Sequence, residues 1–420
     1  MRDVRMYNPT HRFPQHRQQG PSVDPSVRWS HQLQDWINEV AVWGDTVYLA
    51  VNESKIVAIG ADGTTRWRFH TDGRVMSSPA VVDGTLYVGD FDDDPTIMGQ
   101  DDVQHNDVGT VYAMDAASGS EQWRYQTDGN VRSSPAVVDD TVYVGSDNGN
   151  VYALDAAKGT KRWRFDGKRN YHIVSPAVVD DTVYVGGSKG YMSGLVYALD
   201  ATNGLEQWHF RTYGDWMSSP TVVDGTVYVG SEEHVYAVDT ASGTEQWRFQ
   251  AESSVEYSSP AVVDGTVYVG CERNVYALEG VDGTEQWRFQ TYGVGSPVVV
   301  DGTVYVGSRS PRVDDTVYAL SAAEGTEQWT FQTVGTVRSS LAVIDGTIYV
   351  GSRDNVEGGR RGTVYALGGE QLGTNTKVYS DSLCSNCGTD LSDHGDPNFC
   401  PECGAETDIS EKSKTQVFDQ

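Results

Sequence analysis

The chain has 420 residues, with 59 Asp and Glu against 31 Lys and Arg, which gives a formal charge of −28. Its 45 Gly, 23 Tyr and 11 Trp indicate many short strands joined by tight turns, and they exclude collagen and generic disorder. No run approaches the roughly 20 apolar residues that span a bilayer, and the polar start lacks a signal-peptide core, so we expect a cytoplasmic protein.

The acidic residues are spread over the whole chain and do not gather in one segment. An even acidic coat with few Lys is typical of proteins in a high-salt cytosol, where carboxylates keep the surface hydrated. The alternative, an acidic face for a basic partner, would need clustering. Binding to nucleic acid is disfavoured, because that affinity depends on Lys and Arg that neutralise phosphates.

Residues 1–26 carry four Arg and two Asp and predict a disordered tail. A repeated aromatic motif, Glu-Gln-Trp-Arg-Phe and its variants, begins immediately afterwards and recurs about every 40 residues. Its tryptophans are Trp29, Trp67, Trp123, Trp163, Trp208, Trp247, Trp287 and Trp329. Three further signals separate them in fixed order: Ser-Ser-Pro-Ala-Val-Val, Asp-Gly-Thr-Val-Tyr-Val-Gly and Val-Tyr-Ala-Leu-Asp. Each unit therefore predicts four strands, which we name A to D.

Turn residues join these strands at fixed places. Asp-Gly pairs such as Asp224-Gly225 supply the positive φ angles of a two-residue hairpin between strands A and B. A glycine four residues before seven of the eight repeat tryptophans, such as Gly243, predicts the turn between strands C and D. Strand B, as in 226–230, is predicted to be packed on both faces.

Four antiparallel strands repeated every 40 residues predict an all-β, eight-bladed β-propeller. The first repeat Trp precedes the first strand A, whereas no Trp follows the last strand C at 363–367. Residues 27–34 should therefore supply strand D of the last blade. Such pairing of the two chain ends closes the ring over residues 27–368 and leaves no open edge.

The pattern Ala-x-Asp-x-x-x-Gly-x-x-x-Trp, at 113–123, 153–163, 198–208 and 237–247, resembles the tryptophan-docking repeat of pyrroloquinoline-quinone (PQQ)-like, BamB-like propellers. The resemblance implies that each repeat Trp docks between neighbouring blades. That family contains quinone-dependent dehydrogenases and non-enzymatic scaffolds, and its enzymes hold Ca²⁺-bound quinone beside a catalytic Asp and adjacent cysteines. This chain has no adjacent Cys pair, so we assign no catalytic residue and do not expect PQQ or Ca²⁺.

Strand parity places the links from strand D to the next strand A, and the loops between strands B and C, on one face. We call it the mouth face. The B–C loops are long at 90–108, 187–194, 309–315 and 353–362. The first contains the acids Asp92, Asp93, Asp94, Asp101 and Asp102, which predict either a cation loop or a solvated acidic loop.

The D–A links vary in sequence just before each Ser-Ser-Pro element, while the flanking residues repeat. The variable positions include Met76, Ile173, Met217 and Val294. The predicted binding residues at the mouth are Trp36, Arg74, Arg132, Tyr171, His172, Trp216, Glu256, Tyr257 and Arg338. Aromatic faces and cations of this kind can stack and pair with a planar acid. A water-filled mouth with no cognate ligand is the alternative.

The composition changes after the last strand, and we expect a linker at 369–382, a zinc ribbon at 383–405 and a polar tail at 406–420. Two Cys-x-x-Cys-Gly pairs, Cys384 with Cys387 and Cys400 with Cys403, predict one structural Zn²⁺. Disulfides are the alternative, which a cytoplasmic location disfavours. The ribbon is rich in acidic residues, so binding to a protein is favoured over binding to nucleic acid. The remaining Cys271 is expected to be a core or loop residue.

The leading hypothesis is a monomeric, non-enzymatic scaffold that binds a protein or a small ligand at the mouth face, with the ribbon as a second protein contact. Two alternatives stay open. One is a quinone-dependent dehydrogenase with PQQ and a divalent cation at the mouth, and the other is a purely structural repeat protein.

Overall fold

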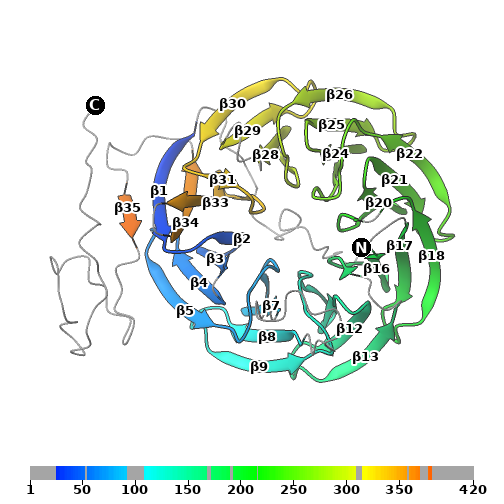
Figure 1. The fold of residues 1–420 in the computed structure, drawn as a ribbon, viewed down its shortest axis with the longest axis horizontal. Coiled ribbons are helices and arrows are strands. Elements are labelled where there is room, and N and C mark those ends of the chain that lie inside the picture. Colours follow the sequence, from blue (N-terminus) through cyan, green and yellow to red (C-terminus); the bar gives the residue numbers. More distant parts are fainter. Residues whose placement is uncertain are drawn as a thin grey trace.

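The computed structural model describes residues 25–52, 54–91, 108–167, 172–189, 193–214, 216–308, 315–356, 359–368 and 377–380. Eight antiparallel sheets stand side by side in a closed ring, which confirms the predicted all-β propeller (Figure 1). Within these residues there is no helix long and apolar enough to cross a membrane.

Seven blades are built from consecutive strands, in the order A to D. Blades 1 and 2 are β2 (Ile37–Trp43), β3 (Thr46–Val51), β4 (Lys55–Gly60), β5 (Thr65–His70), and β6 (Ala80–Val82), β7 (Thr85–Gly89), β8 (Thr110–Asp115), β9 (Glu121–Gln126). Blades 3 and 4 are β10 (Ala136–Val138), β11 (Thr141–Gly145), β12 (Asn150–Asp155), β13 (Lys161–Asp166), and β15 (Ala177–Val179), β16 (Thr182–Lys189), β17 (Ser193–Asp200), β18 (Glu206–Thr212). Blades 5 and 6 are β19 (Thr221–Val223), β20 (Thr226–Ser231), β21 (His234–Asp239), β22 (Glu245–Gln250), and β23 (Ala261–Val263), β24 (Thr266–Gly270), β25 (Asn274–Glu279), β26 (Glu285–Gln290). Blade 7 is β27 (Val298–Val300), β28 (Thr303–Gly307), β29 (Thr316–Ser321) and β30 (Glu327–Gln332).

The two ends of the propeller meet in blade 8, as the sequence predicts. Its strands are β32 (Ala342–Ile344), β33 (Thr347–Val356), β34 (Gly359–Gly368) and, as strand D, β1 (Ser26–Leu33). β1 pairs antiparallel with β34, with Trp29 opposite Ala366. A further strand, β35 (Lys377–Ser380), pairs parallel with the outer edge of β1, and the sequence did not predict it.

Turn chemistry sets the hairpins between strands A and B. Asp83, Asp224 and Asp264 have φ angles of 49°, 47° and 50°, and each is followed by a glycine that also has positive φ. In the Asp139-Asp140 variant both residues adopt positive φ, at 45° and 58°. The B strands that follow are almost wholly buried, so they form the middle layer of each blade.

A repeated clamp joins neighbouring blades. In blade 1 the Trp67 Nε1–H and the Tyr48 hydroxyl both donate to the Ala116 carbonyl of blade 2, each at 3.0 Å. The Trp67 ring lies on Gly119, where a Cβ would come within 2.6 Å of it. Gly119 also has a φ of +72°, so both the turn and the docked ring require glycine. The implied docking of the repeat Trp between blades is therefore present.

The clamp repeats around the ring, and burial changes the chemistry of its tyrosines. In blade 7 the Tyr305 and Trp329 rings are 5.8 Å apart at their centroids. Burial raises the pKa of Tyr305 to about 12, because the phenolate would lose its hydration. In blade 2 the Tyr87 hydroxyl is a structural donor to the Ala156 carbonyl at 3.2 Å, whereas the Trp329 indole N–H of blade 7 has no partner among the described residues.

Two of the predicted long B–C loops are instead strand extensions. β16 and β17 continue their ladder to Lys189 opposite Ser193, and β33 and β34 continue to Val356 opposite Gly359. The prediction of loops at 187–194 and 353–362 was wrong, because the inserted residues prolong an antiparallel register. The long segments at 92–107 and 309–314 lie outside the described residues.

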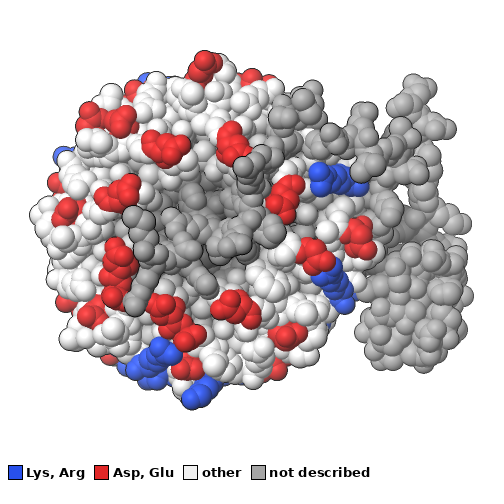
Figure 2. Space-filling model, turned by 180° about the vertical axis from the view of Figure 1, so that it is seen from behind, with Lys and Arg blue, Asp and Glu red and all other residues white. Residues whose placement is uncertain are grey.

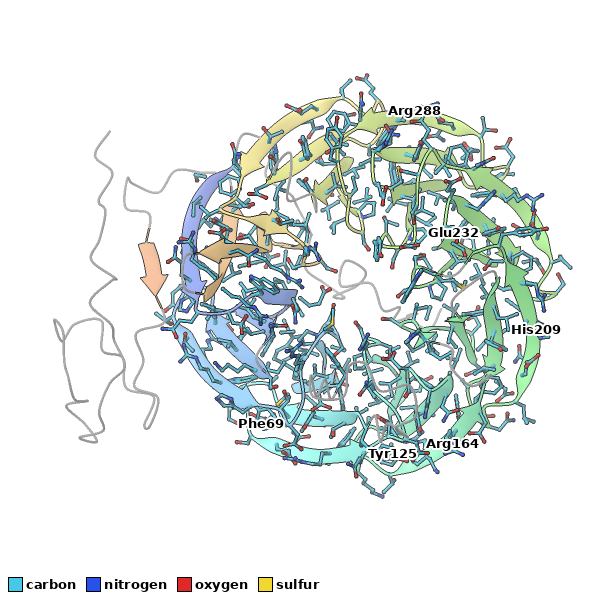
Figure 3. All side chains as sticks on the ribbon, viewed as in Figure 1. Phe69, Tyr125, Arg164, His209, Glu232 and Arg288 are labelled. Carbon is cyan, nitrogen blue, oxygen red and sulfur yellow. The ribbon has the colours of Figure 1, made fainter. Side chains whose placement is uncertain are left out.

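The outer strands carry much of the charge. Arg164, His209 and Arg288 lie on the rim of the ring (Figure 3), where Arg288 Nε is 2.8 Å from Glu285 Oε1. On the face drawn in Figure 2, Asp and Glu recur around the ring, and Lys and Arg are sparse. No single acidic patch stands out on that face, as the spread of acids along the sequence leads one to expect.

Candidate functional site

The D–A links and B–C loops lie against each other, which places both on the mouth face. Arg74 in the link before blade 2 forms a two-way backbone bridge with Phe91, at 2.8 and 2.9 Å. The short link strand β14 (His172–Ile173) pairs in the same way with β16, and β31 (Thr336–Val337) pairs with β33. Side chains from links and loops therefore meet.

Each link rests on a repeated support. In blade 3 the Ser133 hydroxyl donates to the Gly145 carbonyl at 2.9 Å and accepts from the Gly145 N–H at 2.7 Å. Gly145 ends β11, and a Cβ there would lie 2.3 Å from Ile173 Cγ2 in the next link. The glycine thus lets the link pack directly on the end of strand B, and the residues above this contact form the mouth.

Five side chains from blades 2 to 5 form a continuous series, which we call the paired arc. Arg132 lies over the Phe91 ring, with Cζ 4.5 Å from the centroid, and its Nε is 3.1 Å from Asp147 Oδ2. The other Asp147 oxygen is 3.2 Å from His172 Nδ1. His172 stacks on Trp216 with centroids 5.6 Å apart and an interplanar angle of 17°. The Asp147 carboxylate therefore holds Arg132 and His172, and His172 positions Trp216.

A buried carboxylate supports the edge of this arc. Asp90, next to Phe91, accepts hydrogen bonds from the Thr110 N–H at 2.7 Å, the Gly73 N–H at 2.8 Å and the Tyr112 hydroxyl at 2.9 Å. Burial raises the pKa of its carboxyl, although the two backbone N–H donors oppose that shift. Asp90 ties the link before blade 2 to strand β8 and so fixes where Phe91 lies.

Trp36 lies apart from the paired arc, at the junction of blades 8 and 1. The Arg360 guanidinium lies 4.5 Å from its ring centroid and that of Arg353 lies 5.9 Å away. Its indole N–H donates to the Asp354 carbonyl at 3.0 Å, and Arg353 Nη2 donates to Asn38 Oδ1 at 2.6 Å. These contacts tie the closing blade to the first one.

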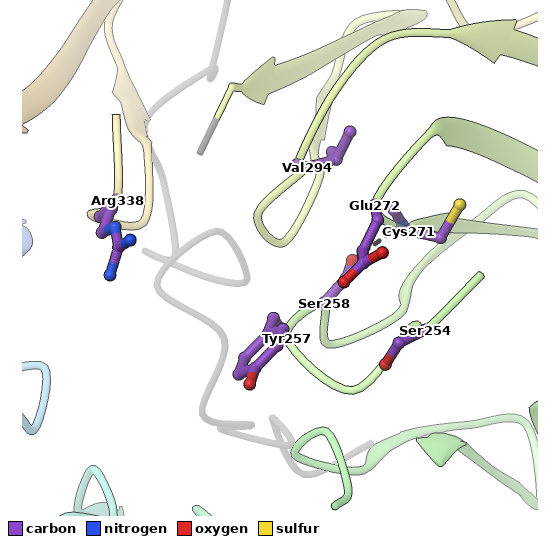
Figure 4. A pocket seen from close by; sticks show the side chains of 9 residues that line it. Ser254, Tyr257, Ser258, Cys271, Glu272, Val294 and Arg338 are labelled. Carbon is purple, nitrogen blue, oxygen red and sulfur yellow. Dashed lines mark hydrogen bonds between the residues drawn. The ribbon is translucent and has the colours of Figure 1, made fainter. Parts of the chain in front are cut away.

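A cavity of about 330 Å³ opens over blades 6 to 8, and we call its lining the open arc. Tyr257, Glu272, Val294 and Arg338 line it, together with Cys271 and Ser258. Figure 4 shows Arg338 on one side and Glu272 and Cys271 on the other, with Tyr257 below them. Cys271 is a buried free thiol that accepts the Asn274 N–H at 3.2 Å, in keeping with the predicted core or loop role.

The predicted mouth residues therefore do not form one cluster. Arg132, His172 and Trp216 come together in the paired arc, Tyr257 and Arg338 in the open arc, and Trp36 stands separately. Arg74 takes part through its backbone bridge, and the half-buried Glu256 lies beside Tyr257. Tyr171, the acids of the predicted cation loop (Asp92, Asp93, Asp94, Asp101 and Asp102) and the four predicted zinc ligands (Cys384, Cys387, Cys400 and Cys403) lie outside the described residues.

Three of the variable link positions are buried beneath the mouth. Ile173 packs on Gly145, Met217 on Gly194 and Val294 on Gly270, so these three side chains are buried against the blades. The sequence reasoning missed Asp147, Glu272 and Arg353. All three follow the last glycine of strand B by two residues, as in Gly-Ser-Asp at 145–147 and Gly-Cys-Glu at 270–272. A charged residue two positions after the last glycine of strand B therefore predicts a charge at the mouth.

The described mouth can stack aromatic groups and form ion pairs. Across the part of the chain that the structure describes, no three His, Cys, Asp or Glu side chains converge to hold a metal ion. The cations of the paired arc and of the Trp36 site already contact protein groups, whereas the open arc lines a cavity that no described side chain fills.

Comparisons with known proteins agree with this architecture. The sequence model of a family described as outer membrane protein assembly factor BamB matches residues 22–104, 93–209 and 172–368. The crystal structure of BamB from Moraxella catarrhalis is similar with a TM-score of 0.65 and 18% identity, over 82% of this chain and 100% of that chain. Quinohemoprotein alcohol dehydrogenase ADHIIG from Pseudomonas putida HK5 has a TM-score of 0.65 and 15% identity, over 87% of this chain and 78% of that one. At these identities the likeness concerns the fold alone.

One curated relative matches a part of this chain. The serine/threonine-protein kinase AfsK of Streptomyces griseus is 32% identical over 133 residues, which is 28% of this chain and 14% of that protein. The match thus spans only a small part of the kinase.

Proposed function

Since the chain belongs to the family of outer membrane protein assembly factor BamB, whose sequence model covers most of it, we propose that it is a non-enzymatic scaffold that binds a partner at its mouth face. The observation that carries this proposal is Trp216, which is 50% exposed yet held in a stack on His172. Exposed, well-positioned aromatic side chains and Arg are the residues that dominate protein–protein binding energy. The mouth face collects both.

The paired arc is suited to binding because it is ordered before a partner arrives. Asp147 fixes Arg132 and His172, and His172 fixes Trp216, so little side-chain entropy remains to be lost on binding. A protein partner with an apolar residue that packs on Trp216 fits this surface.

The predicted C-terminal ribbon supplies a second contact in this proposal. Cys384, Cys387, Cys400 and Cys403 would hold one structural Zn²⁺, and four thiolates leave no open position for chemistry. Its acidic residues favour a protein over nucleic acid. Metal analysis of the purified chain tests this directly, and we expect one zinc per chain. A chelator should remove this zinc and unfold the ribbon.

The described residues do not fit a PQQ site as the dehydrogenase alternative requires it. A planar tricyclic tricarboxylate needs several cations free to converge on its carboxylates. Arg132 is paired with Asp147, Arg353 binds Asn38, and the Trp36 ring already contacts Arg360. Reconstitution with PQQ and Ca²⁺, followed by desalting, should leave no retained quinone, and stoichiometric retention would contradict the scaffold.

The acidic coat supports a further proposal, that the protein works in a high-salt cytosol. A net charge of −28 creates self-repulsion that salt screens. The melting temperature should therefore rise steadily with KCl, and a melting temperature that does not depend on salt would contradict this adaptation.

The mouth-face proposal is tested by a combined variant, Arg132→Ala with Trp216→Ala and Arg338→Ala. Affinity capture of partners from the native host extract should fail with this variant and succeed with the unchanged chain. A matched control replaces Arg164, Arg288 and His209 on the outer rim with Ala and should capture the same partners. If the mouth variant retains every partner, the proposed surface is wrong.

A further inference from the structure

The cavity of the open arc differs from the rest of the mouth in having charges that no described residue neutralises. Arg338 and Glu272 line the same volume of about 330 Å³ from opposite sides (Figure 4). In the described part of the chain, neither side chain forms an ion pair, with the other or with a third residue. One guanidinium and one carboxylate thus remain available to a ligand.

The remaining lining adds an aromatic face and an apolar floor. Tyr257 is 57% exposed and borders the cavity, while Val294 and Cys271 are buried beneath it. Ser258 belongs to the link support, because its hydroxyl accepts the Gly270 N–H at 2.8 Å. A volume of this size lies at the lower end of the range for small-molecule sites, about 300–1,000 Å³.

The charge balance of the lining selects among ligand classes. The only Arg and the only carboxylate among the described lining residues oppose each other, so a polyanion or a metal ion would find one partner and one repelling group. A ligand that carries both signs would satisfy both walls. A guanidinium can bind a carboxylate through two parallel hydrogen bonds, and a carboxylate can accept from an ammonium group.

We propose that this cavity binds a small zwitterion with one carboxylate and one primary ammonium group, namely an α-amino acid with an apolar side chain. Arg338 binds the carboxylate, Glu272 binds the ammonium group, and the side chain lies against Tyr257 and Val294. This inference rests on the proposed function of the mouth face as a binding surface, and it names the ligand of one part of that face.

Calorimetric titration of the full chain tests the proposal. The probes are the common α-amino acids, the dipeptide Leu-Leu, and two analogues of leucine, 4-methylpentanoate without the ammonium group and 3-methylbutylamine without the carboxylate. We expect saturable binding of leucine and at least about tenfold weaker binding of each analogue, since each loses one charge-assisted contact. Leu-Leu should bind more weakly than leucine, because its charged ends are farther apart; tighter binding of Leu-Leu would assign the site to peptide ends. No saturable binding of any amino acid overturns the proposal.

Two variants test the roles of the charges. Glu272→Gln should abolish the preference for leucine over 4-methylpentanoate, and Arg338→Gln should abolish the preference for leucine over 3-methylbutylamine. A change of packing alone would weaken all three ligands together and would count against the assignment. The controls Arg288→Gln and Glu285→Gln, an ion pair on the outer strand β26, should bind leucine as the unchanged chain does.

The outcome is separable from that of the scaffold. Partner capture that depends on the mouth residues, without any binding of amino acids, rejects the zwitterion site and leaves the scaffold. Leucine binding without mouth-dependent capture of a partner keeps the site and rejects the partner surface.

Discussion

The paired arc and the open arc stand on the same repeated support and differ in whether their charges find protein partners. In the paired arc, Asp147 lies between Arg132 and His172 and meets both. In the open arc, Glu272 occupies the matching position after strand B, and no described cation reaches it. The residue two positions after the last glycine of strand B thus orders its neighbours in the paired arc, and it presents its charge to the cavity in the open arc. The difference arises from the links, since the position that holds Arg132 in the link before blade 3 holds Tyr257 in the link before blade 6, and Arg338 lines the cavity from the link before blade 8.

The largest predicted effect concerns the support that both arcs share. A Cβ at Gly145 would lie 2.3 Å from Ile173 Cγ2, and one at Gly270 would lie 2.6 Å from Val294 Cγ1. Because the branched carbons cannot move without shifting the link, Gly145→Ala and Gly270→Ala should each lower the free energy of unfolding by about 1–3 kcal/mol. Chemical denaturation measures this loss.

The control for these variants is Gly359→Ala, where nothing lies within 4 Å of the added carbon and no positive φ is required. It should leave the denaturation midpoint nearly unchanged. Equal midpoints for all three variants would show that the close approach of link and strand B is not what supports the arcs.

The next effect concerns the buried carboxylate at the edge of the paired arc. Asp90→Asn replaces an acceptor of three hydrogen bonds with an amide whose NH₂ must face one of the donors. A buried donor without a partner costs about 1–3 kcal/mol, so we expect a loss of about 2 kcal/mol in the free energy of unfolding. The open arc, which has no equivalent residue at Cys271, should keep its ligand binding.

The Asp90 variant also has a predicted pH dependence. Burial raises the folded-state pKa of this carboxyl above the ordinary value of 3.8, so folding favours its protonated form. That contribution is complete below the unfolded pKa and is lost as the pH rises through the folded pKa. Since Asn does not titrate, the deficit of Asp90→Asn should be largest at the acid end and shrink as the pH rises through this window. A deficit that grows with pH there would reverse the assigned direction.

A smaller effect is expected from the centre of the paired arc. Asp147→Ala removes the ion pair with Arg132 and the contact with His172, but both partners are nearly half exposed and water screens them, so the loss should be about 1 kcal/mol. The stronger signal should be optical, because His172 is no longer held against Trp216 and the indole emission should change. Asp128→Ala, which removes a more exposed ion pair to Arg164, is the control and should leave that emission unchanged.

The repeats explain why the framework was predictable and the mouth only partly so. Every B strand begins at a threonine directly after the two-residue turn, from Thr46 to Thr347, because this turn fixes the register within a few residues. The contact of His172 with Trp216 joins different blades and depends on link lengths that vary along the chain. Ile173 shows this dependence, since the link between β13 and β15 is one residue longer than the link that carries Arg132, and Ile173, a predicted mouth position, is buried.

The smallest predicted effect separates the two arcs most directly. Arg338 is exposed and has no partner among the described residues, so Arg338→Gln should change the free energy of unfolding by less than about 0.5 kcal/mol. Arg132→Gln, by contrast, loses a contact with Asp147 and one with Phe91, and should cost up to about 1 kcal/mol. Denaturation of both variants in low and high salt is the measurement, because screening should reduce only the cost at Arg132. An Arg338 variant as unstable as the Arg132 variant would mean that this guanidinium serves the fold, and the distinction between a structural arc and a ligand-binding arc would then fail.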